Sequence, residues 1–310
     1  MPKNRIVVAL GRNAFGETFP EQQKAIKKAA GAIADLVEDN YDIVITHSNG
    51  PQVGMLHTAM TEFARLDSHY TVAPMSVCSS LSQGYMGYDL QNILRTELLN
   101  RGLYKPVATI ITQVKVDPFD EAFANPTKII GRYMSGEEAE EEKKKGNHVI
   151  KEEKGYRRII ASPKPLEIYE IDSINALLAA GQVVIAAGGG GIPVLEQGTA
   201  LKGASAVIEK DATSVLLAEA VGAQSLLFLT GVEKVCYAYG QADERPLDTV
   251  TVSEAQKYIN DNQFEAGSIL PKIEASVKFI TGGDDREAVV THINKALDAL
   301  HGKTGTHFIK

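Results

Sequence analysis

The segment from Ile6 to Ala14 constrains the fold more than any other, because an apolar run there ends at a glycine shortly before a predicted helix. Residues 6–10 read Ile-Val-Val-Ala-Leu, and such a run, rich in β-branched side chains, predicts a buried strand. Gly11 and Asn13 are typical turn residues, and a helix is predicted over residues 21–38. A strand that stops in this way presents backbone N–H groups at the carboxyl edge of a sheet. Open α/β sheets bind anionic ligands at that edge.

Two further segments repeat this pattern and strengthen the prediction of a ligand-binding edge. Residues 43–51 read Ile-Val-Ile-Thr-His-Ser-Asn-Gly-Pro, and residues 183–193 read Val-Val-Ile-Ala-Ala-Gly-Gly-Gly-Gly-Ile-Pro. Pro51 suits the first turn of a helix, where no backbone N–H is needed. A run of four glycines costs conformational entropy, so it is expected where the backbone approaches a ligand or takes a positive φ. A flexible turn in the glycine run and a plain Asn-Gly turn at residues 49–50 are the alternatives.

Strand-like and helix-like segments alternate along the chain, which predicts a mostly parallel sheet with helices on both faces. The helix predicted over residues 76–101 contains Gly84 and Gly87, where it could break. Residues 105–113 are predicted as one buried strand. The other predicted helices cover residues 52–66, 136–145, 172–180, 210–221, 253–262, 269–280 and 292–300, and the other predicted strands cover residues 148–150, 156–161, 182–187, 225–231, 287–291 and 306–309.

The composition changes between residues 132 and 158, where charged residues dominate. Ser135 is followed three residues later by Glu138, which is typical of a capping box at a helix start. Glu140 and Lys144 are four residues apart, a spacing that supports an exposed helix. Two interpretations remain open. The segment is either a solvent-exposed surface segment, or a small lid-like subdomain inserted in the main sheet.

The chain has 310 residues, 44% of them hydrophobic, which is enough for one large α/β domain or two modest lobes. Its formal net charge of −7 argues against nucleic acid as the main partner. No apolar run approaches the roughly 18 residues of a membrane span, and the first residues do not resemble a signal peptide, so a cytoplasmic protein without a membrane partner is expected. Cys78 and Cys236 lie in apolar sequence without metal-ligand spacing, which predicts two core residues with reduced thiols.

Three lysines stand at positions suited to anion binding. Lys210 and Asp211 open a predicted helix, Lys272 lies at the start of another, and Lys128 follows Asn-Pro-Thr just before the charged segment. An acid beside a lysine can fix the ammonium while it binds phosphate, although such a pair is more often a surface ion pair. The sequence has no nucleophile elbow and no complete P-loop or dinucleotide motif. Three glycine-rich turns and three lysines therefore favour phosphoryl transfer by positioning and charge neutralisation.

With these motifs in place, the chain resembles the carbamate kinases of the amino acid kinase family, nearly from end to end. The resemblance is carried by residues 9–14, 46–54, 82–88, 112–114, 125–128, 156–158, 162–165, 188–194, 210–211, 229–232, 267–268 and 271–272. It implies a three-layer αβα sandwich with a mostly parallel central sheet, forming a single amino acid kinase domain over residues 1–310. Residues 1–171 would bind carbamate, residues 172–310 would bind nucleotide, and residues 132–158 would form a small protruding subdomain. A homodimer is implied, which interconverts ATP plus carbamate with ADP plus carbamoyl phosphate and runs toward ATP in catabolism.

The resemblance also implies roles for the residues that match the family's motifs. Lys210 and Lys272 would flank the transferred phosphoryl group, and Asp211 would orient them. Lys128 would reach the site from the base of the subdomain. Mg²⁺ would bridge the phosphates of ATP or ADP, and no metal site made of protein ligands is implied. The residues implied to bind the carbamate-type substrate are Gly11, Arg12, Asn13, Ser48, Asn49, Gly50, Gly188, Gly189 and Gly190, and those implied to bind nucleotide are Lys210, Thr230, Gly231, Gly267, Ser268 and Lys272.

Two positions depart from the family pattern. The family has Gly-Gly-Asn where this chain has Gly11-Arg12-Asn13, and His-Gly-Asn-Gly where this chain has Ser48 after the histidine. Each change adds a side chain beside the inferred phosphoryl path, and an arginine there could clamp phosphate or block carbamate. Two alternatives follow: a related kinase with an altered acceptor, or a catalytically silent binding or regulatory protein. Retention of the three lysines and the aspartate argues against the silent protein.

Overall fold

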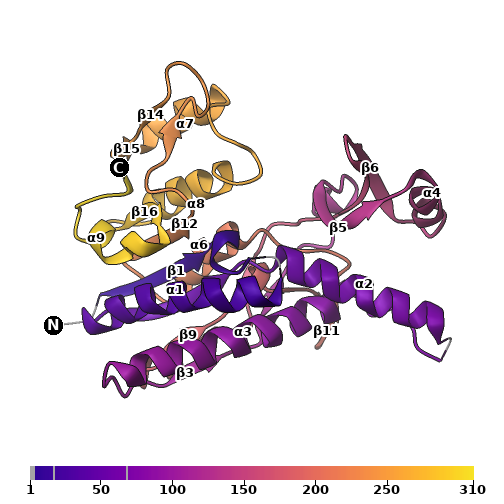
Figure 1. Cartoon of the computed structure of the whole chain (residues 1–310), viewed down its shortest axis with the longest axis horizontal. Helices are drawn as coiled ribbons and strands as arrows, with labels where there is room; N and C mark the ends of the chain where they lie inside the picture. The colour runs from indigo at the N-terminus through magenta and orange to yellow at the C-terminus, as the bar shows by residue number, and fades with distance from the viewer. Residues whose placement is uncertain (1–3, 17, 68) are drawn as a thin grey trace.

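An eight-stranded, mostly parallel sheet forms the centre of the computed structural model, which describes residues 4–16, 18–67 and 69–310 (Figure 1). The strands lie in the order β15-β17-β16-β12-β1-β2-β9-β3, and every neighbouring pair is parallel except β16 and β17. The bounds are β1 (Arg5–Leu10), β2 (Asp42–His47), β3 (Val107–Thr109), β9 (Val183–Ile185), β12 (Ser225–Thr230), β15 (Thr249–Thr251), β16 (Glu287–His292) and β17 (Thr306–Ile309). This topology confirms the predicted α/β fold with a mostly parallel central sheet.

Helices cover both faces of the sheet, and the alternation of side chains along β1 shows why. Ile6, Val8 and Leu10 are fully buried in one apolar cluster, with side chains of α1 and α3. Val7 and Ala9 point the other way into a second cluster, with side chains of α5, α6, α7 and α8. The sandwich therefore has two cores. The helices are α1 (Phe19–Glu38), α3 (Met75–Asn100) and α9 (Ala296–Leu300) at the first core, and α5 (Ile171–Ala179), α6 (Lys210–Ala220), α7 (Val252–Asn260) and α8 (Leu270–Thr281) at the second.

Three smaller sheets surround this sandwich. The four-stranded sheet is β11 (Ala200–Gly203), β10 (Ile192–Gln197), β4 (Gln113–Lys115) and β8 (Glu167–Ile168), and a two-stranded ribbon is β13 (Cys236–Tyr237) with β14 (Arg245–Pro246). We call the third the outer sheet, and it consists of β5 (Lys128–Met134), β7 (Gly155–Ile160) and β6 (His148–Glu152). Figure 1 shows the outer sheet with α4 (Gly136–Lys144) standing away from the main sheet, near α2 (Gly50–Leu66).

The outer sheet begins before and ends after the charged segment recognised in the sequence. The predicted helix with its capping box is present, because Ser135 and Glu138 exchange both capping hydrogen bonds at the start of α4. The predicted hairpin is present as β6 and β7, which pair antiparallel. Strand β5 was not predicted, and it pairs with β7 from Lys128↔Ile160 onward. Ile130 and Ile160 are buried in a small apolar cluster with Val53 of α2.

Three local predictions were wrong. The single strand predicted over residues 105–113 is divided into β3 and β4, which belong to different sheets. Between them, Thr112 Oγ1 donates to the carbonyl oxygen of Ile110 at 2.8 Å, and this local hydrogen bond competes with strand pairing. The predicted break at Gly84 and Gly87 is absent, since α3 is continuous. Cys236 is only half-buried on β13, whereas Cys78 is fully buried as predicted.

Within the described residues, none of the helices is both long enough and apolar enough to span a bilayer.

Gly87 is required for packing between α3 and β3, and Gly84 is not, which gives a matched pair of substitutions. A β-carbon at Gly87 would lie 2.3 Å from Cγ2 of Thr109, whereas one at Gly84 would meet nothing within 4 Å. We expect Gly87→Ala to lower the free energy of unfolding by about 1–3 kcal/mol through overpacking. Gly84→Ala should instead raise it by about 0.5–1 kcal/mol, because alanine restricts the unfolded chain more than glycine does. Urea unfolding of both variants checks this, and equal effects would contradict the close approach at Gly87.

Candidate active site

The turns singled out in the sequence lie together at the carboxyl edge of the main sheet. Strands β1, β2, β9 and β12 are parallel neighbours, so their carboxyl ends meet at one edge. The turns continue the ladder, because the N–H of Gly11 donates to Leu229 O at 3.0 Å and that of Ser48 donates to Leu10 O at 3.0 Å. The predicted convergence of three turns at one edge is therefore present.

The glycine run is the most constrained of these turns. The backbone is in the left-handed region at three of the glycines, with φ values of 65° at Gly189, 91° at Gly190 and 91° at Gly191. Residues other than glycine rarely adopt such φ values. Gly188 needs its hydrogen for a different reason, since a β-carbon there would lie 2.3 Å from Nε2 of His47. A β-carbon at Gly189 would lie 2.0 Å from Nδ2 of Asn49. The glycines thus allow the turn after β9 to pack directly on the turn after β2.

Polar side chains from neighbouring helices hold the glycine run in place. Gln83 of α3 donates to Gly188 O at 3.0 Å, and Thr213 of α6 donates to Gly190 O at 2.9 Å. Gln83 and Thr213 are buried. Because carbonyl oxygens of the run are satisfied in this way, its conformation is fixed by the two helices. Neither side chain was identified as functional from the sequence.

The turn after β2 brings Ser48, Asn49 and Gly50 to the start of α2. Asn49 is the N-cap residue of α2, but its side chain makes no capping bond and instead donates to Oγ of Ser82 at 2.7 Å. A β-carbon at Gly50 would meet no other atom within 4 Å, so the space beside this residue is open. Ser48 has a negative φ, and a side chain at that position therefore causes no backbone strain.

The turn after β1 forms a short 3₁₀ helix over Arg12–Ala14. Arg12 and Asn13 are exposed, and Arg12 has an ordinary negative φ. A β-carbon at Gly231 would lie 2.1 Å from Nδ2 of Asn13, so these two residues pack the turn after β1 against the turn after β12. Thr230 is turned inward, where its hydroxyl donates to Val232 O at 3.0 Å and accepts from the N–H of Val232.

Two lysines share one buried aspartate behind these turns. Lys210 and Asp211 begin α6, and Lys272 lies in the first turn of α8. One carboxylate oxygen of Asp211 accepts from Lys210 Nζ, and the other accepts from Lys272 Nζ at 3.0 Å. Only 2% of the Asp211 side chain is exposed, against 9% for Lys210 and 13% for Lys272. Two ammonium groups on one carboxylate leave a net positive charge in a poorly solvated place.

Burial and mutual attraction set the protonation of this cluster. Burial would raise the pKa of the Asp211 carboxyl, but the two lysine ammonium groups outweigh it and leave that pKa below its ordinary value. Burial lowers the pKa of the Lys210 ammonium, and the nearby Lys272 charge lowers it further. Asp211 is thus a permanent anion that holds two cations, an arrangement suited to neutralising oxygens of a transferred phosphoryl group.

Lys128 lies nearby but does not join the cluster. It is the first residue of β5, and its ammonium forms an ion pair with Glu209, the N-cap residue of α6. Glu209 directly precedes Lys210, so the pair links the base of the outer sheet to the α6 end of the cluster. The Lys128 side chain is 43% exposed.

Gly267 and Ser268 lie in the turn before α8. The backbone carbonyl of Ser268 accepts from Lys272 Nζ at 3.0 Å, which helps to orient that ammonium. The Ser268 hydroxyl donates to the carboxylate of Glu265. Gly267 has nothing within 4 Å of a built β-carbon. The turn therefore supports the cluster through its backbone.

His47 is a buried residue of this site to which sequence reasoning gave no role. Burial lowers its pKa to about 4, so the imidazole is neutral at pH 7. Its Nδ1 lies 3.1 Å from Ser48 O and donates to it as the N–H, which leaves Nε2 facing Gly188. The histidine was visible in the sequence, but its contact with the glycine run depends on the pairing of β2 with β9.

Comparison with known proteins identifies the class to which this fold and this site belong. The profile of the amino acid kinase family matches residues 4–292, and the chain belongs to that family. Within the family the protein is a carbamate kinase-like phosphotransferase.

Three relatives support this placement. Carbamate kinase-like protein YqeA of Escherichia coli is 50% identical over 304 residues, which cover 97% of this chain and 98% of that protein. Carbamate kinase of Clostridium perfringens is 42% identical over 313 residues, covering 99% and 100%. The structure of carbamate kinase from Giardia lamblia bound to AMP-PNP matches with a TM-score of 0.93 and 33% identity, covering 100% of this chain and 99% of that one.

The buried state of His47 makes a testable contribution to stability. Its pKa is about 4 in the folded protein against an ordinary value of 6.5, so the unfolded chain binds more protons between these pH values. The free energy of unfolding should therefore rise by up to roughly 3 kcal/mol from this group as pH increases through that window, and level off above it. Urea unfolding between pH 4.5 and 7.5 measures this, and His47→Asn should flatten the curve. Parallel curves for the two proteins would show that His47 is not the cause.

Proposed function

We propose that the protein is a carbamate kinase, which transfers a phosphoryl group reversibly between ATP and carbamate to give ADP and carbamoyl phosphate. The observation that carries this proposal is the buried Asp211 with Lys210 and Lys272 on its two oxygens, next to three glycine-rich turns at one sheet edge. In catabolism the expected direction is toward ATP.

The chemistry needs positioned charge more than it needs covalent participation. A loose phosphoryl-transfer transition state spreads negative charge over three equatorial oxygens. Lys210 and Lys272 neutralise that charge, and Asp211 keeps both ammonium groups oriented. Backbone N–H groups near Gly11, at the start of α2 and in the glycine run cradle the substrate and the phosphates.

Each half of the chain contributes a different part of the proposed site. The turns after β1 and β2 come from residues 1–171, which we propose to bind carbamate, and the lysine cluster comes from residues 172–310, which we propose to bind nucleotide. The similarity to a carbamate kinase structure that contains AMP-PNP supports nucleotide binding by this half. We further propose that residues 132–158 act as a protruding subdomain, and that Lys128 at its base exchanges Glu209 for substrate.

The residues present fit a magnesium ion that arrives with the nucleotide. Within the described parts of the chain, no three His, Cys, Asp or Glu side chains converge as a metal site. Each oxygen of Asp211 accepts from one lysine ammonium, so this carboxylate serves to hold the two lysines. Magnesium commonly keeps several waters and binds through substrate phosphates, where it neutralises phosphate charge. The three lysines would share that task from the protein side.

We also propose a homodimer that uses the outer face of α3. Val77, Leu81 and Tyr88 are 42%, 41% and 66% exposed, and their spacing places them on one side of the helix. A stripe of apolar side chains of this kind is typical of a protein interface. The cytoplasmic location expected from the sequence stays a prediction.

The lysine cluster can be tested by ATP formation from ADP, Mg²⁺ and carbamoyl phosphate. Lys272→Ala should lower kcat by roughly 10²-fold or more, because it removes charge stabilisation in the transition state. Lys278→Ala is the matched control, since Lys278 is exposed on the same helix and its loss should leave kcat unchanged. No ATP formation by the wild-type protein would overturn the proposed function, and near-normal kcat in Lys272→Ala would remove that lysine from the mechanism.

A second candidate function, a kinase with an altered acceptor, is favoured by Arg12 and Ser48. Both side chains stand on unstrained backbone at the edge of the site, so the fold accommodates them.

We expect Arg12→Gly, best combined with Ser48→Gly, to raise turnover with carbamate. If Arg12 clamps phosphate, as we propose, the same change should weaken carbamoyl phosphate binding, because a guanidinium with five donors is lost. Steady-state kinetics separates the outcomes. Tighter binding would mean that Arg12 blocks the site, and no change in either quantity would place it outside the site.

A further inference from the structure

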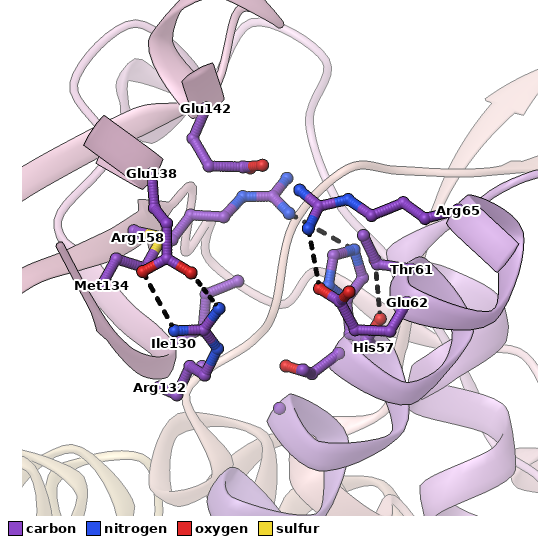
Figure 2. Close-up of a pocket in the computed structure, with 13 residues that line it drawn as sticks. His57, Thr61, Glu62, Arg65, Ile130, Arg132, Met134, Glu138, Glu142 and Arg158 are labelled. Atoms are coloured by element: carbon purple, nitrogen blue, oxygen red, sulfur yellow. Dashed lines mark hydrogen bonds and ion pairs between the residues drawn. The ribbon is translucent and has the colours of Figure 1, made fainter. Parts of the chain in front are cut away.

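A cleft separates α2 from the outer sheet and contains none of the residues assigned to phosphoryl transfer (Figure 2). Its volume is about 70 Å³. About 10–15 Å³ on this measure holds one water molecule, so the cleft has room for several waters or for a small ion. Its walls come from two parts of the chain, because α2 contributes His57 and Arg65 while the outer sheet contributes Arg132 and Arg158.

The three glutamates that line the cleft already have their own donors. Glu62 accepts from Arg65 at 3.0 Å, and Glu138 accepts from both Nη1 and Nη2 of Arg132. Glu142 accepts from Lys145 Nζ at 2.8 Å and from Asn147 Nδ2 at 2.7 Å. Each carboxylate is therefore bound to a donor other than Arg158.

Arg158 is the cation of the cleft without a bonded carboxylate among the described residues. Its Nη1 lies 3.3 Å from Nε2 of His57, and its Nε is buried with no hydrogen-bond partner in the described parts of the chain. Burial lowers the pKa of the His57 imidazole, and the Arg158 charge lowers it further, so His57 is neutral and its Nε2 accepts from the guanidinium. Arg158 thus has a neutral hydrogen-bond acceptor. Burial lowers the pKa of its guanidinium, whereas the Glu142 charge raises that pKa without a direct hydrogen bond. A guanidinium with a buried, unpartnered donor favours an anion that bonds it directly.

Arg65 provides a second guanidinium from the opposite wall. In Figure 2 it extends into the cleft from α2, while Arg158 extends into it from the outer sheet. Arg65 is 47% exposed in its side chain and bonds Glu62 through Nη1, so its remaining donors can face a ligand. An anion in the cleft can therefore accept hydrogen bonds from both guanidinium groups.

We propose that this cleft is a binding site for a small oxyanion of the phosphate or carboxylate type, with Arg158 as the main ligand and Arg65 as the second. Arginine matches such groups because its planar fork donates two parallel hydrogen bonds. Neutral His57 holds the Arg158 guanidinium in position from behind. The bound ion would contact both α2 and the outer sheet, so its occupancy would add to the apolar contact that Val53, Ile130 and Ile160 already make between them. This site is additional to the proposed kinase site and does not depend on it.

The test is calorimetric titration of the full-length, nucleotide-free protein with potassium phosphate at ionic strength held constant with potassium chloride. Arg158→Gln should weaken phosphate binding to this site at least tenfold, and Arg65→Gln should weaken it severalfold. Lys151→Gln is the control, because Lys151 is exposed on β6 and lies outside the cleft, and it should leave the affinity unchanged. An unchanged affinity in Arg158→Gln overturns the proposal.

Two further comparisons cover a variant that fails to fold and phosphate that binds at the lysine cluster instead of the cleft. If Arg158→Gln loses cooperative unfolding, Arg158→Lys and Arg65→Gln replace it, and wild-type affinity in both overturns the proposal. Lys272→Ala should leave the Arg158-dependent binding intact, which separates this site from phosphate held at the lysine cluster. If Lys272→Ala abolishes all phosphate binding, the cleft does not bind phosphate.

The same titration with potassium bicarbonate and with potassium acetate shows which type of oxyanion the cleft prefers. Tighter binding of phosphate assigns the cleft to phosphate-type ions, and tighter binding of the planar anions assigns it to carboxylate-type ions. If chloride binds the cleft as tightly as these oxyanions do, the cleft does not select oxyanions, and the proposal is overturned.

Discussion

The carboxylate of Asp211 is the interaction on which the rest of the site depends. Two ammonium groups could not lie close together in a buried place without it, since each is costly to remove from water and each repels the other. Asp211 and Lys210 open α6 and Lys272 lies in the first turn of α8, so the carboxylate also fixes these helices relative to each other. Both helices belong to the core on one face of the sheet, which transmits that constraint to β1 and β12.

The glycine-rich turns depend on a second constraint, which is direct packing between adjacent loops. Gly188 lies against the His47 ring, and Gly231 lies against the Asn13 side chain. These contacts lock the turn after β9 to the turn after β2, and the turn after β12 to the turn after β1. The result is a continuous rim of backbone groups along four neighbouring strands, preorganised before any ligand binds. Rigid support of this kind costs little reorganisation during a reaction.

Much of the fold could be predicted from the sequence, because buried parallel strands and amphipathic helices have strong local patterns. The strands that end at the candidate site were predicted in this way, and the three lysines were singled out by their places at two helix starts and before the charged segment. What could not be predicted depends on tertiary contacts. Gly87 looked like a helix break, but it is the point where α3 approaches Thr109. The division of residues 105–113 into β3 and β4, the burial of His47 and the pairing of Lys128 with Glu209 also arise only when distant segments meet.

The ion pair between Lys128 and Glu209 has a consequence for the site between reaction cycles. Glu209 is an internal carboxylate that occupies Lys128 while the adjacent Lys210 remains with Asp211. In the proposed function, a substrate anion that binds Lys128 would exchange with a counter-ion that the protein itself supplies, and the same group would replace the departing product. The ammonium of Lys128 therefore has an anionic partner both before and after each exchange. The released Glu209 carboxylate cannot diffuse away, because it belongs to the chain one residue from the most buried lysine, and it takes the ammonium back when the product leaves.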